Sequence, residues 1–202
     1  MNQTGFLSET YWNNRYLNRE TGWDIGFVAT PLKEYVDQLT DKNMSILIPG
    51  AGNGHEASYL FEAGFAQVHV LDFAAEPLLA FHKKHPAFPK ENLIEQDFFK
   101  HTGQYDLIVE QTFFCALSPT LRPQYVRHMH SLLKPNGKLI GLLFNDPLPG
   151  DNPPFGGDVK LYQELFSPYF EIAIMETAYN SIAPRKGREL FVKMIPKKAG
   201  NQ

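Results

Sequence analysis

Cysteine is nearly absent from this sequence, since Cys115 stands alone among 202 residues. An intrachain disulfide is therefore impossible, which is typical of proteins that work in the reducing cytoplasm. Long apolar runs are also missing, because no stretch approaches the ~20 residues that a membrane-spanning helix needs. The polar start, Met1-Asn2-Gln3-Thr4, lacks the apolar core of a secretory signal. We expect a cytoplasmic protein with no membrane partner.

Basic clusters are scarce as well. The formal net charge is -3, and apart from the short Pro196-Lys197-Lys198 tail no block of lysine or arginine stands out. Nucleic-acid-binding domains present a concentrated positive surface, so we expect no nucleic-acid partner. Hydrophobic residues make up 43% of the chain, an ordinary globular composition, and the length suits one domain, residues 1–202. Nothing in the sequence indicates an oligomeric state.

From residue 44 onward, apolar strand-like segments alternate with helical patterns. This alternation predicts a parallel sheet with helices on both faces. The last two strands are joined by a segment without a helical pattern, so we expect an antiparallel hairpin at the sheet edge. Pro135-Asn136-Gly137 predicts a turn. The expected strands are 44–48, 67–71, 93–96, 106–110, 138–144, 170–176 and 190–195, and the expected helices are 54–63, 76–84, 119–133 and 159–166.

A glycine-rich turn joins the first expected strand to the helix after it. Gly50, Gly52 and Gly54 follow the apolar run Ile46-Leu47-Ile48 at alternating positions, and Asp72 ends the next strand. Glycines let the backbone approach a ligand closely, and an acid at the second strand tip can accept hydrogen bonds from ribose hydroxyls. This arrangement is typical of a nucleotide-binding half-site.

The spacing of these glycines favours one kind of ligand. A dinucleotide site reads G-x-G-x-x-G and holds a pyrophosphate at the helix N-terminus. Here the pattern is G-x-G-x-G, and His55 stands where the third glycine of a dinucleotide site packs helix against strand. A ligand without phosphate, such as S-adenosylmethionine (SAM), fits this spacing better. A nicotinamide-dependent oxidoreductase is the alternative that the spacing disfavours.

The segment before residue 44 is rich in aromatic residues and lies outside the strand–helix alternation. Trp12, Tyr16 and Trp23 are spaced four and seven apart, so we expect them to share one helical face. Two interpretations stay open. The aromatic residues form either a stripe that docks a helix on the core or a lid, within residues 1–40, that covers the ligand. A sulfonium is a cation, and aromatic faces attract cations.

Several segments, in shared order and spacing, match a known pattern. They are residues 12–32, 48–56, 96–99, 112–117, 132–137 and 181–189. Together they resemble the thiopurine S-methyltransferase superfamily, nearest to the plant-type halide and thiol methyltransferases and their bacterial relatives. The resemblance covers nearly the whole chain.

The resemblance implies a class I SAM-dependent methyltransferase. Its fold is Rossmann-like α/β, with a mostly parallel seven-stranded sheet, an antiparallel edge strand and an N-terminal helical lid. SAM is then the cofactor and S-adenosylhomocysteine (SAH) the product. Asp72 is expected to hold the ribose hydroxyls, and Asp97 and Phe98 to meet the adenine. The implied cofactor-binding set is Trp12, Tyr16, Trp23, Gly50, Gly52, Gly54, Asp72, Phe73, Asp97, Phe98, Glu110 and Gln111.

The implied reaction is methyl transfer to a small soft nucleophile, namely a thiol, hydrosulfide or halide, by in-line displacement. Phe113, Phe114 and Phe155 are the expected substrate pocket. A thiopurine-type aromatic thiol methyltransferase is the second interpretation. Enzymes of that type have an arginine where this chain has Gln111, which argues against it. A non-catalytic SAM-binding module is the third. Gly156-Gly157 predicts a loop more flexible than the family's.

The chemistry limits the catalytic residues that we expect. A sulfonium expels a neutral leaving group, and a halide or thiolate needs no base. A thiol must lose its proton, and a cation nearby increases the thiolate fraction. Arg185 is the candidate for that cation. The alternative is that Arg185 is only an exposed arginine in a loop. Asp24 is the matched acid that binds the methionine ammonium, acts on a substrate proton or caps the arm. Cys115 is expected to be structural, and no metal site is expected.

Overall fold

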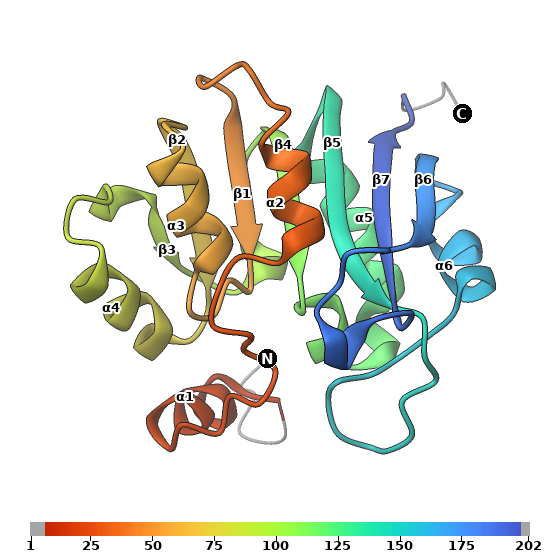
Figure 1. The fold of residues 1–202 in the computed structure, drawn as a ribbon, viewed down its shortest axis with the longest axis horizontal. Helices are drawn as coiled ribbons and strands as arrows, with labels where there is room; N and C mark the ends of the chain where they lie inside the picture. The colour runs from red at the N-terminus through yellow and green to blue at the C-terminus, as the bar shows by residue number, and fades with distance from the viewer. Residues whose placement is uncertain (1–6, 199–202) are drawn as a thin grey trace.

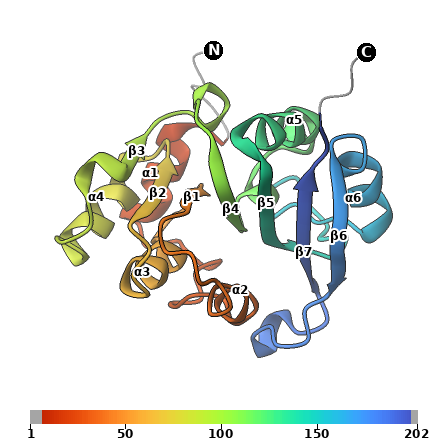
Figure 2. The same cartoon turned by 90° about the horizontal axis from the view of Figure 1, so that it is seen from above.

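The computed structural model describes residues 7–198, so residues 1–6 of the expected arm and the last four residues lie outside it. Seven strands form one sheet in the order β3-β2-β1-β4-β5-β7-β6, with helices on both faces (Figures 1 and 2). The expected α/β architecture is confirmed. The strands are β1 (Ser45–Pro49), β2 (Gln67–Asp72), β3 (Leu93–Glu95), β4 (Tyr105–Gln111), β5 (Leu133–Phe144), β6 (Phe170–Thr177) and β7 (Glu189–Pro196).

The helices include one that the sequence patterns did not predict, α2. Of the described residues, the α-helices are α1 (Glu9–Leu17), α2 (Thr30–Val36), α3 (His55–Glu62), α4 (Ala75–Lys84), α5 (Arg122–Leu132) and α6 (Val159–Phe166). Short 3-10 turns are η1 (Lys90–Asn92), η2 (Phe98–Lys100), η3 (Phe114–Ala116), η4 (Pro119–Leu121) and η5 (Ala183–Arg185). None of these helices is long and apolar enough to cross a membrane.

The centre of the sheet sets the position of the crevice. β1 is almost fully buried, with Ile46 and Leu47 at 0% exposure, as its apolar run requires. It pairs in parallel with β2 on one side and with β4 on the other. The chain therefore reverses its strand order at β1, and parallel sheets bind ligands outside the carboxyl ends of strands at such a point.

Two hydrophobic cores lie on opposite faces of the sheet. One joins α2, α3 and α4 to the sheet, and the other joins α5 and α6 to it. Leu32 and Val36 of α2 are buried in the first core, at 0% and 3% exposure. Proline at the first turn suits the start of α2. Within the expected arm, α2 thus belongs to the core, and the lid interpretation concerns the residues before it.

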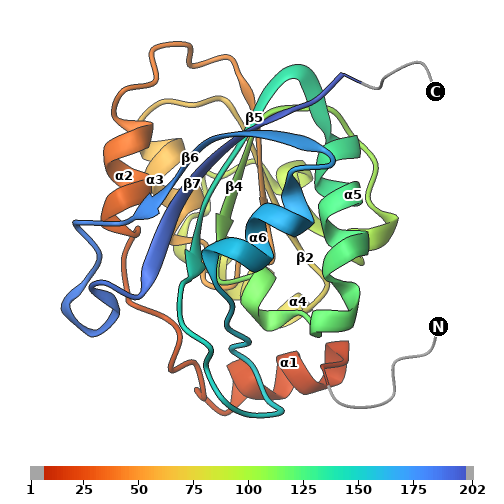
Figure 3. The ribbon, with the colours of Figure 1, turned by 90° about the vertical axis from the view of Figure 1, so that its right-hand side faces the viewer.

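The hairpin expected at the sheet edge is present. β6 and β7 pair antiparallel, and β7 also pairs antiparallel with β5, so β7 is the strand that runs against the others. Figure 3 shows β7 beside β5, with β6 at the edge. The turn expected at Pro135-Asn136-Gly137 falls within the range of β5 as a bulge: Tyr105 pairs with Leu133 and Leu107 with Lys138, so residues 134–137 stand opposite Asp106 alone.

The first helix lies outside the sheet. Figure 1 shows α1 beneath the carboxyl ends of the strands, near the long β5–α6 connection. Ser8 caps it by accepting a hydrogen bond from the backbone N–H of Tyr11 at 3.1 Å. α1 ends at Leu17, so the expectation that Trp23 shares a helical face with Trp12 and Tyr16 is wrong. Trp23 lies in the loop that follows.

Candidate functional site

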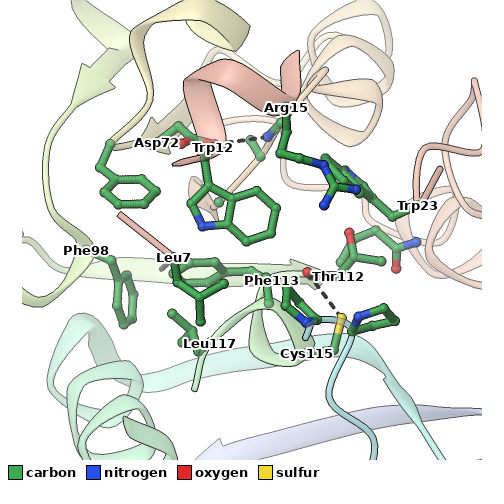
Figure 4. A pocket seen from close by; sticks show the side chains of 18 of the residues that line it. Leu7, Trp12, Arg15, Trp23, Asp72, Phe98, Thr112, Phe113, Cys115 and Leu117 are labelled. Atoms are coloured by element: carbon green, nitrogen blue, oxygen red, sulfur yellow. Dashed lines mark hydrogen bonds between the residues drawn. The ribbon is translucent and has the colours of Figure 1, made fainter. Parts of the chain in front are cut away.

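A cavity of about 1520 Å³ opens at the carboxyl ends of β1, β2 and β4. α1 and its following loop cover one side, and the segment after β4 forms another (Figure 4). Of the residues predicted to bind the cofactor or act in catalysis, those in the cavity wall are Trp12, Tyr16, Trp23, Asp24, Gly50, Gly52, Asp72, Phe73, Asp97, Phe98, Gln111 and Arg185. Phe113 of the predicted substrate pocket is there as well.

The glycine turn after β1 has a backbone that only glycine adopts readily. Gly50, Gly52 and Gly54 have φ angles of 59°, 52° and 69°. A side chain at Gly50 would also run into the Phe113 ring, and a Cβ at Gly52 would lie 2.7 Å from the Tyr16 hydroxyl oxygen. The turn thus combines left-handed backbone with two close approaches.

Gly54 does not have the predicted place. It lies outside the cavity wall, and a Cβ there would be 2.5 Å from the Phe81 ring of α4. Its role is to begin α3 in a left-handed conformation and to let α4 pack closely. The glycine pattern could not separate this packing duty from ligand contact.

Asp72 ends β2 as a nearly buried carboxylate, at 6% exposure. Its Oδ2 accepts a hydrogen bond from the Gly52 N–H at 3.2 Å, and its Oδ1 accepts one from the Ala74 N–H at 2.9 Å. Burial raises the pKa of Asp72 to about 6, although these backbone donors oppose the increase. The carboxylate is therefore fixed against the glycine turn, where a ligand with hydroxyl donors would complete its shell.

Asp97 and Phe98 lie on the neighbouring stretch of wall. Asp97 caps η2 by accepting a hydrogen bond from the Phe99 N–H at 3.0 Å. Phe98 is 4% exposed and packs edge-on against Phe113, with ring centroids 5.1 Å apart. One carboxylate oxygen of Asp97 thus has a structural duty, while the residue still faces the cavity.

The aromatic residues of the arm form a cluster over the cavity. Trp23 packs edge-on against Trp12 and Tyr16, with centroid distances of 5.5 Å and 5.9 Å. Such pairs each contribute about 1 kcal/mol beyond area burial. Arg15 adds its guanidinium at 5.1 Å from the Trp23 ring. Sequence spacing found the three aromatic residues but missed Arg15, which carries no motif of its own.

Asp24 ties the arm to the glycine turn. Its Oδ1 lies 2.8 Å from His55 Nε2 and accepts from the Gly26 N–H at 2.7 Å, and its Oδ2 accepts from Asn53 Nδ2. Partial burial raises the pKa of Asp24, but these hydrogen bonds outweigh it and hold the pKa below its usual value. Both oxygens are engaged, so among the predicted roles this geometry favours capping the arm.

Arg185 holds the same arm from another side. Its Nη2 donates to the backbone carbonyl of Trp23 at 2.5 Å, and its Nη1 pairs with Glu189 at 3.2 Å. Arg185 is 9% exposed, so the interpretation of an exposed loop arginine is wrong. Its charge is already paired, and this geometry favours positioning over thiol activation.

Glu110 is not in the cavity wall, contrary to the prediction. It is 2% exposed, and Oε1 accepts from the N–H groups of Phe113 and Phe114 at 2.9 and 3.0 Å. Oε2 accepts from the Tyr125 hydroxyl at 2.5 Å. Burial raises the pKa of Glu110. The acid therefore shapes the turn after β4, while Gln111 beside it faces the cavity.

Two of the three phenylalanines predicted to form the substrate pocket do not line the cavity. Phe114 is 1% exposed and belongs to the core under α5 and α6. Phe155 lies outside the cavity wall, and its N–H donates to the Cys115 carbonyl at 2.7 Å. Leu148, Pro153 and Pro154 of the same connection line the cavity instead, as do Thr112, Cys115 and Leu117 after β4.

The glycine pair after Phe155 does not loosen this connection. A side chain at Gly156 would overlap the Asp146 carbonyl oxygen, and one at Gly157 would lie 2.5 Å from the Tyr162 hydroxyl. Gly157 also pairs with Asp146, its N–H donating to that carbonyl at 3.0 Å. The two glycines are there because the backbone packs tightly, so the expected extra flexibility is wrong.

Comparison with protein families places this chain among known sequences. A family model described as thiopurine S-methyltransferase matches residues 7–199. Thiocyanate methyltransferase 1 of Brassica oleracea is 31% identical over 195 residues, covering 91% of this chain and 85% of the relative. A thiopurine S-methyltransferase of Vibrio parahaemolyticus is 23% identical over 179 residues, covering 80% of this chain and 82% of the relative.

Solved structures share the fold at low identity. A 1,6-didemethyltoxoflavin-N1-methyltransferase of Burkholderia thailandensis superposes with a TM-score of 0.75 and 17% identity, covering 95% of this chain and 87% of that one. The magnesium protoporphyrin IX methyltransferase of Synechocystis, solved with bound SAM, gives a TM-score of 0.70 and 15% identity, covering 98% and 100%. The class I methyltransferase fold expected from the sequence is thereby confirmed.

Proposed function

Because this chain belongs to the thiopurine S-methyltransferase family, we propose that it transfers a methyl group from SAM to a small soft nucleophile. The acceptor is a thiol, hydrosulfide or halide, and the products are SAH and the methylated acceptor. One observation carries the proposal: a single cavity joins the buried Asp72 and the glycine turn to a wall of Phe113, Leu117 and Cys115. The free Cys115 thiol accords with a cytoplasmic location, which we propose as well.

The residues present fit the cofactor. Asp72 can accept hydrogen bonds from ribose hydroxyls, since a carboxylate has about four acceptor sites and its oxygens face the cavity beside the N–H donors of Gly52 and Ala74. Phe73, Asp97 and Phe98 border the space for the adenine. Trp12, Tyr16 and Trp23 close over the methionine end. SAM supplies an electrophilic methyl group with a neutral leaving group.

The chain itself supplies position and dryness. In-line displacement needs the nucleophile on the axis and water excluded, and the aromatic arm and Phe113 meet both needs. Neither Asp24 nor Arg185 is free to move a proton, because both are bound to partners. Burial raises the pKa of the Cys115 thiol to about 12, so it is not a nucleophile. The acceptor therefore arrives already ionised.

A thiopurine-type acceptor is the second candidate. Bacterial relatives with that name match this chain, and the cavity volume of about 1520 Å³ does not exclude an aromatic ring. Gln111 lies at the carboxyl end of β4. The resemblance implies an arginine at this position in thiopurine-type enzymes. We therefore rank this acceptor below hydrosulfide and halide. A SAM-binding module without catalysis would leave the acceptor end of the cavity without a purpose.

A direct assay tests the proposal. SAH release is measured with SAM and, separately, hydrosulfide, iodide and an aromatic thiol. We expect turnover with hydrosulfide or iodide to exceed turnover with the aromatic thiol. Binding of SAM but not of NAD, measured by calorimetry, is the accompanying control. Protein that binds SAM and turns over none of the three acceptors would contradict the proposal.

Replacing Arg185 with methionine tests positioning against thiol activation. The change removes the hydrogen bond to the Trp23 carbonyl and leaves Glu189 unpaired. We expect a higher KM for SAM and a similar loss of kcat/KM, about tenfold or more, with hydrosulfide and iodide. Steady-state kinetics with both acceptors decide the matter. A loss confined to the thiol would restore Arg185 as the group that ionises it.

A further inference from the structure

Arg122, at the start of α5, is a buried guanidinium without a carboxylate partner. It is 4% exposed. Its Nη2 donates to the backbone carbonyls of Phe155 and Gly156 at 3.1 and 2.9 Å, and its Cζ lies 4.6 Å from the Phe114 ring centroid. Nε has no hydrogen-bond partner. Buried charges are normally paired, so this unpaired cation requires an explanation.

The acidic residues around this end of the molecule are already engaged. Glu110 accepts three hydrogen bonds from the turn after β4 and from Tyr125. Glu189 pairs with Arg185, and Asp146 pairs with Arg188. Within residues 7–198, no carboxylate lies within ion-pair distance of Arg122. Its charge is thus not neutralised by the described protein.

Arg122 is next to residues of the cavity wall, although it does not line the cavity itself. Its sequence neighbour Leu121, and Gln124 in the same first turn of α5, line the cavity. The backbone that it binds, at Phe155 and Gly156, follows Pro153 and Pro154, which also line the cavity. The guanidinium therefore holds this part of the wall through hydrogen bonds and places a positive charge next to it.

The charge of Arg122 acts on the cavity wall. Burial and the Glu110 carboxylate raise the pKa of the Cys115 thiol, while the guanidiniums of Arg185 and Arg122 lower it. Cys115 lines the cavity, so a group on the wall already interacts with Arg122. Arg185 is compensated by Glu189, so of these two cations Arg122 is the one without a carboxylate partner; its effect on the Cys115 thiol is smaller than the opposing effect of Glu110.

We propose that Arg122 makes the acceptor end of the cavity selective for anions. A small anionic nucleophile, such as iodide or hydrosulfide, is drawn to the buried positive charge across the wall. A neutral acceptor of similar size gains nothing from it. Arg122 is a specificity-determining residue that acts without touching the acceptor. The inference rests on the proposed function only for the identity of the reaction, since anion binding is measurable without turnover.

Two variants separate charge from wall support. Arg122→Gln and Arg122→Lys each keep a donor for the carbonyls of Phe155 and Gly156, but only lysine keeps the charge. Arg127→Gln, an exposed position on the same helix, is the matched control for loss of one positive charge. Circular dichroism and SAH affinity confirm that each variant is folded.

Iodide is the probe for binding and for turnover. Both tryptophans of the chain, Trp12 and Trp23, line the cavity, so bound iodide quenches their fluorescence saturably. In SAH-bound protein at constant ionic strength, we expect the half-saturating iodide concentration to rise about tenfold in Arg122→Gln, a coupling of ~1.4 kcal/mol. In Arg122→Gln we also expect the KM for iodide to rise about tenfold and the KM for SAM to remain unchanged. Arg122→Lys and Arg127→Gln resemble wild type, and quenching by neutral acrylamide is equal throughout.

The outcomes distinguish this inference from the proposed function. Equal losses in Arg122→Gln and Arg122→Lys would overturn the inference, because wall support alone would then explain them. Unchanged iodide binding in Arg122→Gln would also overturn it, even if iodide is methylated as proposed. Saturable, Arg122-dependent iodide binding without any methyl transfer would support the anion site and remove the proposed reaction.

Discussion

Asparagine in place of Asp72 weakens SAM binding by at least tenfold. The substitution keeps the shape of the side chain but removes the negative charge, and its amide presents donors where ribose hydroxyls need an acceptor. Hydrogen bonds to a charged group contribute about 1.5–3 kcal/mol, which corresponds to roughly ten- to a hundredfold in affinity. Calorimetric titration with SAM and SAH measures the change. Unchanged affinity would remove Asp72 from the cofactor site.

The pH dependence of the same titration has a definite sign. The pKa of Asp72 is about 6 in the unliganded fold, against a usual value of 3.8. Ribose hydroxyls donate to the ionised form, so SAM affinity in the wild type falls as pH drops below about 6. The Asp72→Asn variant has no such decrease from this group. Affinity of the wild type that is flat between pH 7 and 5 would contradict the role of the ionised carboxylate.

Stability of the unliganded protein changes in the opposite direction. A folded pKa above the unfolded value adds stability below pH 3.8 and loses it as pH rises through about 6. Asp72→Asn removes this loss, so at pH 7 the unliganded variant is expected to melt at the wild-type temperature or above it. Weaker binding without lower stability separates a ligand role from a folding role.

Replacing Glu110 with alanine lowers the free energy of unfolding by about 3–5 kcal/mol. The carboxylate accepts hydrogen bonds from two backbone N–H groups and from the Tyr125 hydroxyl. Alanine leaves these three donors without partners inside the core, and each unsatisfied group costs about 1–3 kcal/mol. Urea unfolding followed by circular dichroism gives the difference.

Glu110→Gln is the matched control. Its amide keeps one carbonyl acceptor and a similar volume, so we expect a smaller decrease in stability. If Glu110 instead bound the cofactor, as the resemblance implied, the glutamine variant would lose SAM affinity while its unfolding free energy stayed at the wild-type value. A loss below 1 kcal/mol in Glu110→Ala would mean that the turn after β4 holds itself without the acid.

The sequence predicted what local patterns determine. Apolar runs between helical segments specified the strands, and the glycine turn with Asp72 located the crevice, because parallel strands bring their carboxyl ends to one edge. Even α6 was predicted with the bounds it has, residues 159–166. The hairpin at the sheet edge followed from the lack of a helix between its strands.

Most of what sequence reasoning missed depends on which way a side chain or backbone segment packs in the folded protein. Gly54 and Gly156 cannot be told apart by sequence, yet Gly54 leaves room for the Phe81 ring and Gly156 leaves room for the Asp146 carbonyl. Glu110 is the acid of the matched motif, but its carboxylate points into the protein, where the N–H groups of Phe113 and Phe114 and the Tyr125 hydroxyl donate to it. Trp23 leaves the helical face of Trp12 because α1 stops at Leu17. The contacts of Gly54 with Phe81 and of Glu110 with Tyr125 join positions far apart in the sequence, so no short motif announces them.

The way in which the arm is fastened has a kinetic consequence. The Trp23 carbonyl is bound by Arg185, Asp24 is bound by His55, and the Ala29 N–H donates to Glu56 at 3.1 Å. Two of these contacts end on α3 and one on η5, so they hold the segment from Trp23 to Ala29 on two sides of the cavity mouth. We therefore expect escape of the spent cofactor, rather than the displacement itself, to set the pace of the catalytic cycle.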